Sequence, residues 1–81
     1  MRINLPLKDN PEKIFETLRQ EIQKKGGTID GDMNRGMFTI LGIKGSYLID
    51  EQDLNIIISH KPFFIPESFI REEIAKYFKQ L

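Results

Sequence analysis

Side chains that carry oxygen recur at every second position in residues 30–36, DGDMNRG, where Asp30, Asp32 and Asn34 have the types of ligand that Ca²⁺ takes. The helix-loop-helix calcium motif also needs glycine at its sixth position and a bidentate glutamate at its twelfth. Counted from Asp30, those positions hold Arg35 and Leu41. We therefore interpret the segment as the polar end of a strand that enters a hairpin, and we expect no metal.

His60 is the single histidine, and an acid-base site near His60 and Tyr47 is the enzyme alternative. Catalysis needs a positioned partner and a metal needs several donors, but the spacing supplies no second histidine, cysteine or carboxylate partner. Asp50, Glu51 and Asp53 crowd one turn, where carboxylates are ordinarily solvated. Without a catalytic constellation, the sequence favours a protein that is not an enzyme and uses no cofactor.

The composition describes one small domain over residues 1–81, in which 12 basic residues balance 12 acidic ones. Nucleic-acid binders normally carry a basic surplus, so we expect no nucleic-acid partner. The absence of cysteine excludes disulfides and thiolate metal sites, and favours a reducing compartment. No apolar run near the start is long enough for a signal peptide or a membrane span. We therefore expect a cytoplasmic location.

Two segments have helical periodicity. In the first, KDNPEKIFETLRQEIQKKGG, Asp9 or Asn10 can cap the helix, Pro11 suits its first turn and Gly26 suits its end. One apolar face of this helix is expected to be buried, with Ile14, Leu18, Ile22 and Phe15 on it. The last segment, SFIREEIAKYFKQL, predicts a second helix whose buried side carries Ile70, Ile74, Tyr77, Phe78 and Leu81.

Between the helices the apolar spacing is close to two. It predicts strands at 28–33, 36–41, 45–50 and 53–59, joined at 34–35, 42–44 and 51–52, and a further short strand at 2–7. The element order is therefore β-α-β-β-β-β-α. Consecutive strands with tight turns predict an antiparallel meander with both helices on one face, which is a two-layer α+β sandwich.

The sheet is expected to have one fully apolar face and one mixed face. The inward row comprises Leu54, Ile56 and Ile58, joined by Tyr47, Ile49, Phe38, Ile40, Ile29 and Met33. The opposite row still contains Met37, Leu41, Leu48 and Ile57 among polar residues. A sheet face open to water usually alternates more cleanly, so this back face is a candidate interface.

The connection KPFFIP joins the last strand to the last helix. Pro62 and Pro66 stiffen it and bias the residues before them toward extended geometry. In an extended chain adjacent side chains point in opposite directions, so at least one of Phe63 and Phe64 is expected to enter the core. The other phenylalanine and Ile65 are expected near the surface, as a contact point.

Gly45, Tyr47 and Ile49 stand at alternate positions, and they are followed by Leu54, Ile56, Ile58, Pro62, Phe63, Ile70 and Ile74. With this pattern, the last fifty or so residues resemble a small bacterial family, the polyhydroxyalkanoic acid system proteins. The resemblance implies a cytoplasmic protein associated with storage granules, and it implies no catalytic activity.

Together these observations predict a small non-enzymatic binding or assembly module. Its candidate interface residues are Met37, Leu41, Leu48, Ile57, Phe63, Phe64 and Ile65. Removal of apolar area from water would drive the association. The candidate partners are a second copy in a homodimer, another protein, a hydrophobic ligand or a granule surface.

Overall fold

A computed structural model describes residues 1–78 of the chain, and Leu81 lies outside the described residues. The elements are β1 (Arg2–Pro6), α1 (Pro11–Lys24), β2 (Thr28–Gly31), β3 (Arg35–Ile40), β4 (Ile43–Asp50), β5 (Asp53–His60) and α2 (Glu67–Tyr77). This order confirms the prediction of an α+β fold with the succession β-α-β-β-β-β-α.

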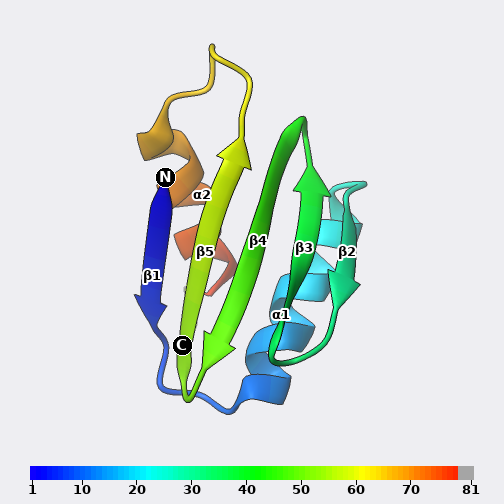
Figure 1. Cartoon of the computed structure of the whole chain (residues 1–81), viewed down its shortest axis with the longest axis vertical. Helices are drawn as coiled ribbons and strands as arrows, with labels where there is room; N and C mark the ends of the chain where they lie inside the picture. The colour runs from blue at the N-terminus through cyan, green and yellow to red at the C-terminus, as the bar shows by residue number, and fades with distance from the viewer. Residues whose placement is uncertain (79–81) are drawn as a thin grey trace.

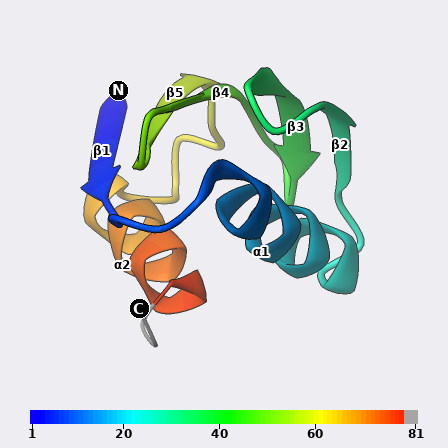
Figure 2. The same cartoon turned by 90° about the horizontal axis from the view of Figure 1, so that it is seen from below.

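The strands form one antiparallel sheet in the order β1-β5-β4-β3-β2. The last four strands are a meander, and β1 completes the sheet by pairing with β5, with Ile3 opposite Ile56. Figure 2 shows that both helices lie on the same face, under the curve of the sheet. The chain therefore has two layers, and the other face of the sheet is covered by neither helix.

Helix α1 begins and ends where its sequence signals predict. The side chain of Asn10 accepts a hydrogen bond from the Lys13 backbone N–H at 2.8 Å, and Pro11 occupies the first turn. Beyond the helix, Gly26 has a φ of 81°, the left-handed conformation that glycine adopts at low cost. These signals fix where α1 begins and ends.

The core fills the space between the sheet and the helices. Its fully buried side chains come from α1 and β5 and are Ile14, Leu18, Ile22, Leu54 and Ile56. Further buried residues include Phe38, Ile40, Ile43, Tyr47 and Ile49 from the inner face of the sheet, and Ile70, Ile74 and Phe78 from the last helical segment. The inward row predicted from alternation is thus confirmed, apart from Met33, which lies outside the strands and is 41% exposed.

The turn between β3 and β4 is shorter than predicted. Leu41 and Gly42 form it alone, with φ angles of 51° and 79°, so β4 already begins at Ile43. Positive φ at both positions is the signature of a type I′ hairpin turn, whose twist matches that of the strands it joins. Ile43 is consequently a buried strand residue, whereas the sequence pattern places it in a turn.

Candidate functional site

The loop between β5 and α2 projects at one end of the molecule's longest axis (Figure 1), and it exposes two phenylalanines. Phe63 is 94% exposed and Phe64 is 72% exposed. Their rings meet edge to face with centroids 5.8 Å apart. The expectation that one of these rings enters the core is wrong. Ile65, which was expected near the surface, is partly buried and packs against the core instead.

The chain direction within the loop explains this outcome. The Ile65 backbone N–H donates to the Pro62 carbonyl at 3.1 Å, so residues 62–65 form a tight turn rather than an extended segment. Phe63 and Phe64 occupy the two corner positions of this turn, and both side chains point outward. The Lys61 ammonium donates to the Ile65 carbonyl at 2.8 Å and holds the turn closed.

The turn between β3 and β4 lies beside this loop. A Cβ added to Gly42 would approach the Cγ of Pro62 to 3.2 Å, so the two segments are in close contact. Leu41, which is 64% exposed, therefore lies at the same end as the phenylalanines. Phe69, in the first turn of α2, is 46% exposed. We call Leu41, Phe63, Phe64 and Phe69 the apolar end.

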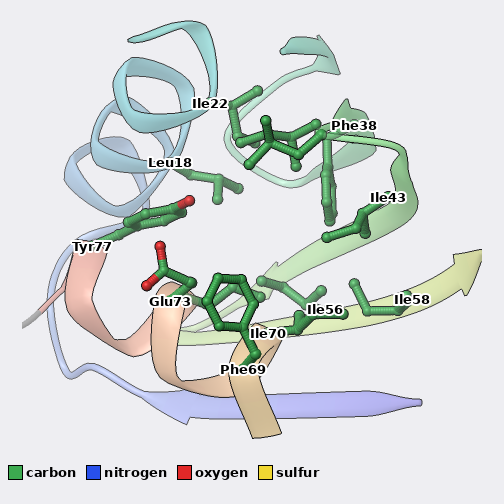
Figure 3. A pocket seen from close by; sticks show the side chains of 13 residues that line it. Leu18, Ile22, Phe38, Ile43, Ile56, Ile58, Phe69, Ile70, Glu73 and Tyr77 are labelled. Carbon is green, nitrogen blue, oxygen red and sulfur yellow. The ribbon is translucent and has the colours of Figure 1, made fainter. Parts of the chain in front are cut away.

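A narrow cavity of about 40 Å³ lies between the helices and the sheet, and Leu41 and Phe69 are among its lining residues. Figure 3 shows Phe69 among the side chains around this cavity. Leu41 thus lies in a turn on the helix side, and not on the back face where the sequence pattern places it. The other lining side chains are apolar except for Glu73 and Tyr77. Burial, followed by the charges of Glu73 and Glu21, raises the pKa of Tyr77 to about 12. The volume of the cavity is well below the ~150 Å³ of a dry apolar cavity that accommodates benzene.

The outer face of the sheet carries Met37, Leu48 and Ile57, as predicted. They are 68%, 47% and 43% exposed. Met37 and Ile57 both pair with Ser46, one from each neighbouring strand, and Leu48 lies two residues along β4. Beside them is a shallow hollow of about 440 Å³ that Arg2, Asn4 and Asn55 also line. We call Met37, Leu48 and Ile57 the sheet triangle.

In residues 30–36, the side chain of Asp32 closes a turn by hydrogen bonds to the backbone of the same segment. The Asp32 carboxylate accepts hydrogen bonds from the backbone N–H groups of Asn34 and Arg35, at 2.8 and 3.1 Å. These two bonds lower the pKa of Asp32. In the described part of the chain, residues 1–78, no three His, Asp or Glu side chains are grouped closely enough to hold a metal ion.

The structure does not bring Tyr47 and His60 together. Tyr47 points into the core, where its hydroxyl donates to the Asp32 carbonyl at 2.7 Å. Burial, followed by the charges of Asp32 and Asp30, raises the pKa of Tyr47 to about 12. His60 is an exposed residue at the end of β5, opposite Lys44, whereas Tyr47 lies opposite Ile56. Nothing in this geometry favours the enzyme alternative.

Charges are segregated along the long axis, although they sum to zero. Near the apolar end, Lys44 pairs with the last residue of β5 and Lys61 lies in the loop. Further along the axis, the Arg71 guanidinium donates to the carbonyl of Arg2, which lies opposite Ile57, at 3.2 Å. Glu67, Glu72 and Glu73 are the acidic residues of this part of α2. At the opposite end lie the β2–β3 and β4–β5 turns and the start of α1. Acidic side chains outnumber basic ones there: Asp9, Glu12, Asp32, Asp50, Glu51 and Asp53, beside Lys8, Lys13 and Arg35.

Comparison with protein-family models, curated proteins and solved structures finds no match to this chain. The similarity to the polyhydroxyalkanoic acid system proteins therefore stays a prediction from the residues quoted above. Among residues 1–78, neither helix combines the length and the apolar character needed to cross a bilayer.

Proposed function

We propose that the protein is a small binding module that attaches to an apolar surface through its apolar end. The observation that supports this proposal is the pair of adjacent phenylalanines, Phe63 and Phe64, which are 94% and 72% exposed. Transfer of each ring out of water contributes about 1.5–3 kcal/mol. Adjacent exposed aromatic rings of this kind typically mark interaction sites on soluble domains.

The construction of the loop supports the same function. Pro62 and Pro66 restrict the backbone at both ends, and the Lys61 and Ile65 hydrogen bonds close the turn between them. A loop that is already ordered loses little conformational entropy when it binds. The rings are therefore pre-organised for contact, and a granule surface is a partner of the required apolar character.

The proposal is tested with suspended polyhydroxybutyrate particles, which offer an uncharged apolar surface. We expect the natural chain to sediment with the particles. The double substitution Phe63→Ser and Phe64→Ser is expected to weaken binding by at least about tenfold, because it removes most of the exposed ring area.

Met37→Ser is the matched control, since it removes a side chain of comparable exposure from the sheet triangle. We expect it to leave particle binding almost unchanged. Circular dichroism establishes that both variants remain folded. Equal binding by the natural chain and the double variant would refute the proposal.

The sheet triangle supports a second candidate function, self-association. The face that carries it is covered by neither helix, and a net charge of zero offers little repulsion between copies. The proposed occupant of this face is a second copy of the chain, which would remove Met37, Leu48 and Ile57 from water.

A further inference from the structure

We infer that the surface recognised by the apolar end is an anionic lipid surface, into which Phe63 and Phe64 insert while nearby cations contact the headgroups. This inference rests on the proposed function and specifies its partner. It concerns attachment to one leaflet, since neither described helix is suited to spanning a bilayer.

The first support is charge complementarity. Lys44 and Lys61, with Glu67, lie on the segments next to Phe63 and Phe64, so basic residues outnumber acidic ones there by one, whereas acidic residues outnumber basic ones by three at the opposite end. This distribution of charge orients the acidic end away from a negative surface and the phenylalanines toward it. Lys and Arg residues near an anionic leaflet strengthen binding by about fivefold each.

The second support is shape. The loop that carries the two exposed rings projects at the tip of a molecule 34 Å long and 20–22 Å wide, so the rings are presented by a convex end and not by a groove. A stable protein interface buries about 800 Å² on each partner, with complementary packing. Two phenylalanine rings supply roughly 300 Å². A fluid lipid surface admits a convex end without a matching pocket, which favours lipid over a folded protein as the partner.

The test uses the absence of tryptophan from the chain. Phe63→Trp places a single fluorescent reporter at the tip of the loop, and Met37→Trp places one on the sheet triangle. Each variant is titrated with vesicles of phosphatidylcholine alone and with vesicles that also contain phosphatidylglycerol. We expect the emission of the Phe63→Trp variant to shift to shorter wavelength only with the anionic vesicles, and the emission of the Met37→Trp variant to stay unchanged.

A second pair of variants isolates the charges. Lys44→Glu and Lys13→Glu change the net charge equally, one near the apolar end and one at the opposite end. In the Phe63→Trp background we expect Lys44→Glu to weaken vesicle binding by about tenfold and Lys13→Glu by less than about twofold. High salt is expected to weaken binding because it screens exposed charges.

Three results would overturn the inference: no spectral shift with anionic vesicles, an equal shift at Met37→Trp, or equal binding to both kinds of vesicle. If the natural chain still binds the uncharged polyester particles through its phenylalanines, the proposed function stands and only the lipid partner is wrong. Loss of binding to both particles and vesicles would refute both proposals. Binding only to a folded protein would assign the apolar end to that other class of partner.

Discussion

At the scale of single residues, Tyr47 shows how a buried phenol links stability to pH. Its side chain is 3% exposed and its pKa rises from 10.0 to about 12 on folding. Below pH 10 the phenol is protonated in both the folded and the unfolded chain, and its full contribution to the free energy of unfolding is present. Between pH 10 and 12 the unfolded chain ionises first, so stability falls as the pH rises. This contribution is about 3 kcal/mol.

We expect Tyr47→Phe to cost about 1 kcal/mol at neutral pH, through the lost bond to the Asp32 carbonyl. Between pH 10 and 12, the unfolding free energy of this variant is expected to decline less steeply than that of the natural chain. Part of the decline remains because the pKa of Tyr77 is also raised to about 12. Urea unfolding at several pH values measures both effects, and equal slopes in the two proteins would contradict the linkage.

At the scale of elements, the β3–β4 turn places a leucine where asparagine is preferred. Leu41 has a φ of 51°, a backbone conformation that is unfavourable for leucine, and its side chain is 64% exposed. Burial therefore does little to offset the unfavourable backbone. We expect Leu41→Asn to raise the unfolding free energy by about 1 kcal/mol. The same change is expected to weaken binding to polyester particles, because it removes one side chain of the apolar end. A less stable variant would show that Leu41 contributes more to packing than its exposure indicates.

The sequence predicts the strands and helices of this fold, but not the conformation of every loop and turn. Alternation and caps predict the elements because burial of one sheet face and one helix stripe outweighs other local preferences. The β5–α2 loop could not be predicted in this way. Both orientations of Phe63 and Phe64 satisfy the spacing, and one backbone hydrogen bond, from Ile65 to Pro62, turns both outward. Similarly, the left-handed backbone at Leu41 has no signal in its residue type.

At the scale of the whole molecule, the uncovered sheet face predicts self-association. Size-exclusion chromatography with light scattering, over a wide range of concentrations, is expected to show a mass that rises toward that of a dimer. The double substitution Leu48→Lys and Ile57→Lys is expected to keep the chain monomeric, because a dimer through this face would bury each lysine charge against the same charge of the other copy. Thr39→Lys, elsewhere on this face, is the control. If the double variant changes neither mass nor stability, this face is not an interface between copies.

The distribution of charge is also a property of the whole molecule, and the composition does not show it. A net charge of zero excludes a basic surplus, but it does not reveal that carboxylates gather at the end of the molecule opposite Lys44 and Lys61. That segregation arises from the strand pairing, which places Lys44 beside His60 and Asp50 beside Asp53. Leu41, Phe63 and Phe64 were predictable as candidate interface residues, whereas the exposure of Phe69, the partial burial of Ile65 and the position of Lys44 required the fold.

The loop that carries Phe63 and Phe64 continues directly from β5, and β5 is paired with β1 on one side and β4 on the other. A pull on the loop acts along the strand, while the ladder bonds run across it. Such a load shears many bonds together and does not peel them apart one after another. If the rings attach to a surface as proposed, we therefore expect a pull on the loop to detach the rings before it ruptures the sheet.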